Sequence, residues 1–340
     1  MGTLEHRVNT SMKLKRVMLT MFIVLLIVSP LSSQAVKEAQ NERDHVTVNL
    51  GAMKGPSGFG VAGITQKGGV INEMASFNVK VHATFNEVIA KLANGELDMA
   101  FLPTNVAANL YAKGVPIKLA AVTGQGMLQF ITTDPQVVEF EDLRGTSIAI
   151  PGAGGSPDQL TQIYFTAFGY DTTDFVTLDY SIASPAQLVQ MYAAGKKDFV
   201  VLPEPFLSMA KAKQPKTIIL LDYQSLWGAL TGTDNYPMTV LVVRDTFIAE
   251  HPELVSLALD EVAMSIDWVN TNVEQAAQEI EKQEILSAEL AQLSIPNCNL
   301  GYINATDAYE SVDMYYNILY GFDYESIGSA VPNEDFYLEK

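Results

Sequence analysis

The stretch ANGELDMAFLP at residues 93–103 decides the fold, because AAGKKDFVVLP at residues 193–203 repeats its pattern one hundred residues later. Each stretch has the end of an amphipathic helix, a glycine turn, an aspartate, an apolar strand and then Leu-Pro. The same offset relates Val48–Leu50 and its glycine-containing loop to Ile148–Ile150 and its loop. The chain therefore builds one kind of α/β unit twice, and two such units facing each other would form a ligand-binding cleft.

The repeat lies within a regular alternation of apolar strands and amphipathic helices. The spacing predicts helices over residues 85–93 and 185–194, each followed by a buried strand. Thr104 can cap the next helix, and Thr306 opens a tyrosine-rich one. Strands are predicted at residues 45–50, 77–81, 99–102, 117–122, 127–132, 146–150, 175–178, 199–202 and 218–221, with a connecting strand at 238–243. This alternation predicts an α/β protein with sheets of parallel type in both lobes.

The first 35 residues have the pattern of a secretory signal peptide and not of a folded segment. The basic stretch KLKR at 13–16 precedes an apolar run over 17–28, and SQA at 33–35 is typical of a cleavage site. The apolar run is shorter than the roughly 20 residues that a membrane-spanning helix needs. We expect cleavage after Ala35 and no stable membrane insertion afterwards. An uncleaved anchor is the alternative.

Composition indicates a large, acidic, exported protein. The chain has 340 residues, of which 48% are hydrophobic and 18% charged, enough for about two domains. Loss of residues 1–35 removes four basic residues and one acidic residue, so the net charge falls from −18 to −21. Such a charge repels nucleic acid. Cys298 is the only cysteine, so neither an intrachain disulfide nor a lipid anchor beside the cleavage site can form.

Two glycine-rich loops stand between a strand and a helix, one in each repeat. The loop that contains Gly154, Gly155 and Ser156 offers free N–H groups at a helix start, where an anion or another acceptor can bind. A tight turn is the alternative for this loop. Its counterpart adds further donors at Met53, Lys54, Gly55 and Ser57. Neither loop has the spacing of a dinucleotide fingerprint or a phosphate-binding P-loop.

Polar residues follow the two repeated strands at equivalent positions. Thr104 and Asn105 come after one Leu-Pro pair, and Glu204 comes after the other. In open α/β sheets, ligands bind beyond the carboxyl ends of strands, so these side chains are candidates to contact a ligand. Glu204 would meet a hydrogen-bond donor or a cationic group, whereas Thr104 also fits a plain helix cap.

Aromatic residues near the expected lobe edges could stack on a planar ligand. Tyr236 and Phe59 are the candidates for this role, with Tyr180 and Trp227 as further possibilities. Packing at a domain seam is the alternative for each of them. The tyrosines between 309 and 324 fit packing better than binding.

The sequence contains no recognisable catalytic or metal-binding arrangement. Its four histidines are scattered, and no His-x-x-x-His or Cys-x-x-Cys pair occurs. The Gly-x-Ser-x-Gly motif of many hydrolases is also missing. We therefore expect no catalytic residue, no metal and no cofactor.

Several segments together resemble bacterial ABC-transporter solute-binding proteins of the nitrate, sulfonate, taurine and thiamine-precursor type. Single segments are weak signals, but their order and spacing over residues 46–338 are specific to the type II periplasmic-binding fold. The segments are Gly95–Asp98, Leu102–Tyr111, Asp142–Gly145, Leu202–Pro205, Arg244–Phe247 and His251–Glu253.

The resemblance implies two α/β lobes that are joined by two crossover strands and close on a ligand in a central cleft. We expect lobe I to comprise residues 36–126 and 236–340, and lobe II residues 127–235. By motif position the cleft would be lined by residues 53–57, 104–105, 152–156 and Glu204. The backbone at Gly55 and at 154–156 would hold a polar or anionic end of the ligand.

The resemblance also implies partners and a location. A periplasmic, monomeric binding protein would deliver a small solute to a membrane permease with a cytoplasmic ATPase. The ligand could be a sulfonate, nitrate, taurine or a pyrimidine-like compound. Two other functions stay open, namely an exported ligand-sensing receptor domain and an enzyme similar to the thiamine-pyrimidine synthases. The enzyme depends on cysteine-rich and histidine chemistry that this sequence lacks.

Overall fold

The computed structural model describes residues 45–339. The predicted signal peptide, its cleavage after Ala35 and the polar residues that follow lie outside the described residues. Residues 45–47 and 72–76 belong to one compact unit, in which the Val46 amide donates to the Met74 carbonyl over 2.9 Å. Residues 48–71 and 77–339 belong to a second unit, which contains every predicted site residue.

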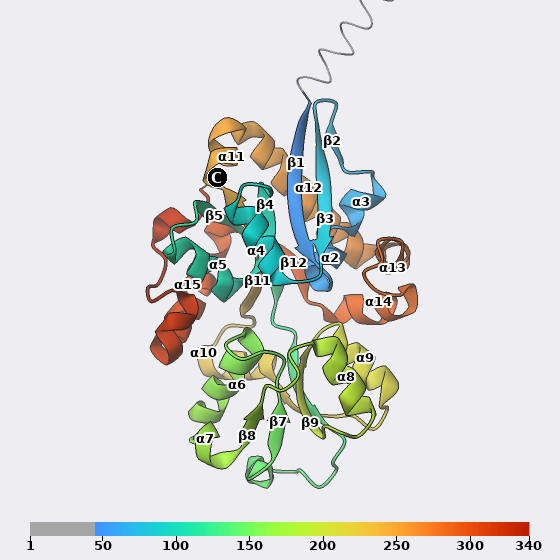
Figure 1. Ribbon diagram of the computed structural model, residues 1–340, viewed down its shortest axis with the longest axis vertical. Helices are drawn as coiled ribbons and strands as arrows, with labels where there is room; N and C mark the ends of the chain where they lie inside the picture. The colour runs from blue at the N-terminus through green and yellow to red at the C-terminus, as the bar shows by residue number, and fades with distance from the viewer. Residues whose placement is uncertain (1–44, 340) are drawn as a thin grey trace, which may run out of the picture. The chain divides into compact units, whose positions relative to one another are not determined.

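A seven-stranded mixed sheet carries the first copy of the repeat (Figure 1). Its strand order is β12-β5-β11-β4-β1-β3-β2. Strands β1 and β4 pair in parallel, whereas β11 pairs antiparallel with both β4 and β5, and β12 pairs antiparallel with β5. The strands are β1 (Val46–Met53), β2 (Val70–Asn72), β3 (Ala75–His82), β4 (Met99–Pro103), β5 (Ile117–Gln125), β11 (Pro237–Arg244) and β12 (Leu300–Asn304).

A five-stranded mixed sheet carries the second copy. Its strand order is β10-β6-β9-β7-β8, with β7 parallel to β8 and β9, and β6 antiparallel to β9 and β10. The strands are β6 (Leu128–Thr132), β7 (Ser147–Ala149), β8 (Thr177–Asp179), β9 (Phe199–Pro203) and β10 (Ile218–Asp222).

The prediction of sheets of parallel type holds for only part of each sheet, and the two crossings between the sheets explain the antiparallel strands. The chain leaves the first sheet through β5 and enters the second at β6 after only two residues. It returns through β11, which must therefore run opposite to β5. Each sheet consequently keeps a parallel βαβ part and adds antiparallel strands next to the crossings.

Helices cover both sheets. Those of the first copy and the C-terminal part are α2 (Pro56–Gly60), α3 (Ala62–Gln66), α4 (Phe85–Ala93), α5 (Thr104–Ala112), α11 (Asp245–Glu250), α12 (Pro252–Thr271), α13 (Val273–Lys282), α14 (Ala288–Ser294) and α15 (Ala305–Asp323). Those of the second copy are α6 (Ser156–Ala167), α7 (Thr172–Phe175), α8 (Pro185–Ala193), α9 (Phe206–Lys213) and α10 (Tyr223–Thr231). Short 3-10 turns cover Phe140–Leu143, Ile295–Asn297, Tyr324–Ile327 and Glu334–Phe336.

The repeated stretch is confirmed as a repeated structure. Helix α4 and strand β4 have their counterparts in α8 and β9 at the same offset of one hundred residues. Gly95 and Gly195 follow the two helices with φ of 80° and 63°, a left-handed conformation that favours glycine. The next amide in each case donates back to the last turn, Glu96 to Lys91 and Lys196 to Met191. Both helices therefore end in the same glycine-dependent turn.

The five-stranded sheet is buried on both faces. Along β9, Val201 packs with Leu160 and Tyr164 of α6, whereas its neighbour Val200 packs with Leu188 of α8. Adjacent strand residues point to opposite faces, so α6 and α8 lie on opposite sides of this sheet. Figure 1 shows the same separation of α6 and α7 from α8 and α9.

Some local predictions need correction. Thr104 is the first residue of α5 and its side chain makes no cap hydrogen bond. Helix α15 is capped by Asn304, whose side chain accepts from the Asp307 amide at 3.0 Å, and not opened by Thr306. The strand predicted at 175–178 is present as β8 but begins at Thr177, because Phe175 still belongs to the short helix α7. Helix α10 was not predicted from the sequence.

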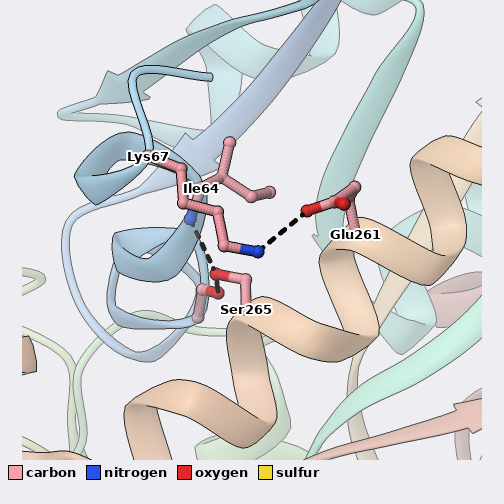
Figure 2. Close-up of polar contacts among 5 residues, drawn as sticks. Ile64, Lys67, Glu261 and Ser265 are labelled. Atoms are coloured by element: carbon pink, nitrogen blue, oxygen red, sulfur yellow. Dashed lines mark hydrogen bonds and ion pairs between the residues drawn. The ribbon is translucent and has the colours of Figure 1, made fainter. Parts of the chain in front are cut away.

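A buried serine ties the broken helix α2–α3 to the long helix α12 (Figure 2). The Ser265 hydroxyl donates to the Gly60 carbonyl at 2.6 Å and accepts from the Ile64 amide at 3.1 Å. An exposed ion pair, Lys67 with Glu261 at 3.3 Å, flanks this contact. Because α2 follows directly on residues 53–55, Ser265 holds the helix that fixes one end of the first glycine loop.

Replacement of Ser265 by alanine is expected to lower the free energy of unfolding by about 2 kcal/mol, because the buried Ile64 amide loses its acceptor. Urea unfolding followed by circular dichroism measures the effect. Ser256→Ala, an exposed position on the same helix, is the control and should change the stability by less than about 0.5 kcal/mol. Equal stabilities of the two variants would contradict the anchoring role of Ser265.

Candidate functional site

The first glycine loop is held mainly by its own residues. Gly55 precedes α2 with φ 126°, a conformation that a residue with a Cβ rarely adopts. The Ser57 hydroxyl accepts from the Met53 amide at 3.1 Å. This hydroxyl is therefore engaged by the backbone. Gly55 also approaches the second sheet, because a Cβ added there would lie 3.9 Å from Cδ of Pro205.

The two remaining candidates of this loop point to other roles. Lys54 is exposed, and its ammonium group donates to the Glu284 carbonyl at 3.0 Å. Phe59 is fully buried, so its ring presents no free face for stacking in this structure. The loop thus supplies backbone groups near Gly55 more readily than side chains.

The second glycine loop is closed by an aspartate from its own helix. The Gly154 amide, at φ 73°, donates to Oδ2 of Asp158 at 2.7 Å. Asp158 lies in the first turn of α6 and is 4% exposed. Its Oδ1 accepts from the Tyr180 hydroxyl at 2.7 Å and from the Gln162 amide at 2.8 Å. The carboxylate therefore occupies the position where the sequence predicts a bound acceptor.

Gly155 and Ser156 begin α6 beside this aspartate. Gly155 is the N-cap residue in an extended conformation, and Ser156 is the first helical residue and buried. Ser156 lies next to the hydroxyl of Tyr315 on α15. Burial raises the pKa of Tyr315 to about 12, so its hydroxyl stays protonated at neutral pH.

The ends of strands β4 and β9 carry buried polar side chains. Thr104 and Asn105 are buried, and neither Oγ1 of Thr104 nor Oδ1 of Asn105 has a hydrogen-bond partner among residues 45–339. The carbonyl of Thr104 accepts from the Tyr316 hydroxyl at 2.9 Å. The backbone at this strand end is thus fixed by α15, while the side chains keep free hydrogen-bonding capacity.

Glu204 is the corresponding residue after β9, and it is 3% exposed. Its carboxylate accepts from the Ser208 amide at 3.0 Å and from the Ser208 hydroxyl at 2.9 Å. Burial raises the pKa of the Glu204 carboxyl, and the two bonds from Ser208 partly offset this shift. A donor or a cation on a bound solute would favour the ionised form.

Three aromatic residues connect the returning crossover with helices of both sheets. Tyr236 lies just before β11, Trp227 on α10 and Tyr315 on α15. The Tyr236 and Tyr315 rings stack with centroids 6.3 Å apart, and Trp227 lies 5.5 Å from Tyr236 and 5.7 Å from Tyr315. Tyr236 is fully buried, and its hydroxyl finds no partner within the described chain.

Buried polar side chains without partners gather at these strand and helix ends, and we call them the unpaired polar set. The set comprises Thr104, Asn105, Gln159, Tyr236 and Tyr315. Within the part of the chain that the structure describes, each has at least one buried oxygen or nitrogen that makes no hydrogen bond. An unpaired buried polar group costs free energy, so such a group is a candidate to bind a solute.

Contacts connect this set from the first sheet to the second. Tyr315 stacks on Tyr236 and lies beside Ser156, and Gln159 follows Ser156 by three residues on the same face of α6. Tyr316, the neighbour of Tyr315, bonds the Thr104 carbonyl. Sequence reasoning missed Gln159 and Tyr315. Gln159 could have been found from its place in the first turn after the loop, whereas Tyr315 was hidden among packing tyrosines.

A pocket of about 280 Å³ lies beside the crossover segments. Glu204 is the one residue of the predicted site that lines it, together with Lys211, Asp222 and Gln129. Gln129 donates to Asp222 at 2.8 Å and accepts from Lys211 at 3.2 Å. Asp222 and Lys211 are therefore linked through Gln129.

Asn299 spans both crossovers at the edge of this pocket. Its side-chain amide donates to the Gly126 carbonyl at 3.0 Å and to Oδ1 of Asn235 at 2.8 Å. Gly126 belongs to the outgoing crossover and Asn235 to the returning one. Asn299 therefore ties the two connections together at the place where the sheets would hinge.

The buried charges of the described residues are mainly negative. Asp158, Glu204 and Glu279 are buried, whereas no lysine or arginine between residues 45 and 339 is. In the same range, no group of three His, Cys, Asp or Glu side chains could hold a metal ion. None of the helices in this range has the length and hydrophobicity that a membrane crossing needs.

Comparison with protein families gives a match over residues 64–283, more than half of the chain, to the model of the NMT1-like family. The chain belongs to the NMT1-like family. A comparison with curated proteins found no match. The family match begins after the first glycine loop, and it covers the repeated stretches at 93–103 and 193–203 and both crossovers. It includes the unpaired polar set except Tyr315, which lies beyond its end.

Solved structures with the same fold extend over nearly the whole described chain of this NMT1-like protein. An ABC transporter structure from Parabacteroides distasonis has a TM-score of 0.73 and 25% identity, covering 86% of this chain and 99% of that one. The periplasmic aliphatic sulphonate binding protein SsuA from Escherichia coli has a TM-score of 0.65 and 15% identity, covering 80% and 87%. The periplasmic nitrate-binding protein NrtA from Synechocystis PCC 6803 has a TM-score of 0.59 and 16% identity, covering 86% and 84%.

These comparisons confirm the resemblance and the two-lobed α/β fold expected from the sequence. The first of these structures is named as an ABC transporter, and the other two are named as periplasmic binding proteins for aliphatic sulphonate and for nitrate. This agrees with the expectation that the NMT1-like chain is a binding protein and not an enzyme.

Proposed function

We propose that this protein is the extracytoplasmic solute-binding component of an ABC importer, which captures a small polar organic solute by closing two lobes around it. The unpaired polar set carries the proposal. Its members come from β4–α5, α6, the returning crossover and α15, and the contacts of Tyr315 with Tyr236 and Ser156 link segments of both sheets. A solute that pairs these groups would remove their desolvation cost and favour the closed arrangement.

The sheet architecture supports closure about the crossovers. Under the proposal, residues 36–126 and 236–340 form lobe I and residues 127–235 form lobe II. The seven-stranded sheet draws its strands from the first range and the five-stranded sheet from the second. Two thin connections, held together by Asn299, are well suited to a hinge.

Location and partners follow from the same proposal. The leader predicted at residues 1–35 would send a monomeric protein to the periplasm, where it delivers the solute to an ABC permease with its ATPase. Similar structures named as periplasmic sulphonate- and nitrate-binding proteins support this location. The formal net charge of −18 opposes nucleic acid as a partner.

Retention of solute tests the proposed site. Freshly purified wild-type protein is expected to keep a small molecule that native mass spectrometry detects. Asn105→Ala removes a buried acceptor of the unpaired polar set, so the variant should bind the solute at least about tenfold more weakly, a loss of about 1.4 kcal/mol.

Asn109→Ala is the matched control, because Asn109 lies one turn further along α5 and already donates to the Glu325 carbonyl at 3.2 Å. The control should retain solute as the wild type does. Equal binding by the wild type and Asn105→Ala would contradict the site. A wild type that neither retains a solute nor is stabilised by taurine, ethanesulfonate, nitrate or a pyrimidine base would contradict the function.

A further inference from the structure

The second glycine loop has the form of an anion site, but its acceptor position is already filled. Oδ2 of Asp158 lies 2.7 Å from the Gly154 amide, a distance typical of a charge-assisted hydrogen bond. The carboxylate stands in the first turn of α6, where the helix dipole favours a negative charge. A solute anion at the same place would have to displace Asp158 or lie beside it.

The surroundings would not favour a second negative charge. Tyr180 and Gln162 hold Oδ1 of Asp158 at 2.7 Å and 2.8 Å, so the carboxylate is fixed by donors on both oxygens. No lysine or arginine within the described range is buried to offset an added anion. Lys54 is exposed and donates to the Glu284 carbonyl, and Lys211 donates to Gln129.

The chemistry of the unpaired polar set also disfavours an anionic solute. Its free groups are hydroxyls and amides, which are uncharged and can both donate and accept. Gln159, three residues after Ser156, has both its Nε2 and its Oε1 unpaired and is buried. Such groups match the hydrogen-bonding edge of a neutral or cationic molecule better than three equivalent oxygens of a nitrate or sulfonate.

We propose that Asp158 is a specificity-determining residue that fills the glycine loop of α6 with the protein's own carboxylate and so restricts the site to uncharged or cationic polar solutes. This inference rests on the proposed solute-binding function and narrows it. From the sequence alone, residues 154–156 could bind an anion or another acceptor, or could form a tight turn. The geometry assigns that position to Asp158.

Titration calorimetry at constant ionic strength tests this role, with ethanesulfonate as the anionic probe. Wild-type protein should give no binding heat with ethanesulfonate. Asp158→Ala frees the Gly154 amide and removes the charge, so this variant should give measurable binding heat with ethanesulfonate. Asp158→Asn keeps the shape of the side chain, so a smaller gain is expected, and it carries the test if the alanine variant does not fold.

Asp171→Ala is the matched control, since Asp171 caps the short helix α7 and accepts from the Thr173 amide at 2.8 Å. The control also removes one negative charge from the part of the chain that carries the five-stranded sheet, and it should gain no affinity for ethanesulfonate. Ethanesulfonate binding by the wild type, or no gain in either Asp158 variant, would overturn the inference. So would a retained anionic solute in the mass spectrum, which would leave the proposed function standing. Absence of any bound solute would instead contradict that function.

Discussion

Replacement of Trp227 by alanine is expected to lower the free energy of unfolding by about 4 kcal/mol, one of the two largest effects among the variants considered. Trp227 is 2% exposed and packs against Tyr236 and Tyr315. Its indole N–H donates to the Thr233 hydroxyl at 2.9 Å. Truncation would leave a cavity between helices α10 and α15 and the returning crossover, where few atoms can move in to fill it.

The loss should also reach the solute site, because Tyr236 and Tyr315 belong to the unpaired polar set. Urea unfolding followed by circular dichroism gives the stability, and native mass spectrometry gives the retained solute. Leu230→Ala on the same helix is the control, since Leu230 is 50% exposed and should cost less than about 1 kcal/mol. A Trp227→Ala protein as stable as this control would show that the aromatic cluster does not join the sheets.

The repeated units could be predicted from the sequence because their signals are local. Gly95 and Gly195 end equivalent helices, and the apolar strands that follow alternate between the two faces of each sheet. Helix α10 was not predicted, because its apolar pattern is short and is interrupted by Gly228, a poor helix former. Asp222, which caps α10 by accepting from Ser225, and Gly232 with φ 76° at its end were the available signals.

The direction in which neighbouring strands pair could not be predicted from local sequence patterns. The sequence around β5 and β11 reads as ordinary apolar strands, yet their antiparallel pairing follows from the two crossings between sheets. Spacing along the chain cannot show where a strand pairs, since the partners of β11 lie more than one hundred residues away. The residues themselves indicated one connecting strand, at 238–243, and only the resemblance to two-lobed binding proteins predicted a pair of crossovers.

The positions of the candidate residues at strand ends could be predicted from the sequence, whereas the contacts that depend on packing could not. Thr104, Asn105 and Glu204 are buried at the ends of β4 and β9. The hydrogen bond from the Gly154 amide to Asp158 depends on the conformation of a single loop, and it places the protein's own carboxylate where an anion or another acceptor was predicted. The closeness of Tyr315 to Tyr236 arises only when α15 packs beside the crossover, about eighty residues later in the chain.

Replacement of Gly126 by alanine is the second large effect, with an expected loss of about 3 kcal/mol in the free energy of unfolding. A Cβ at this position would lie 2.7 Å from Cζ of Tyr236, closer to Cε1 of the same ring and closest to Oε1 of Gln224. The ring is buried and stacked on Tyr315, so it cannot move away without disturbing the aromatic cluster. The outgoing crossover would have to shift instead, which would strain the Asn299 bond to the Gly126 carbonyl.

Gly301→Ala is the control, because it distinguishes the clash with Tyr236 from a general cost of replacing glycine. Gly301 lies in β12, its φ is not positive, and a Cβ there would have open space within 4 Å. The control should keep wild-type stability within about 0.5 kcal/mol and retain solute normally. Because Gly126 belongs to the crossover, its variant should also bind solute more weakly than the control at temperatures where both are folded. Wild-type stability and binding in Gly126→Ala would mean that the crossover tolerates a shift, and that the hinge does not depend on the packing of Tyr236.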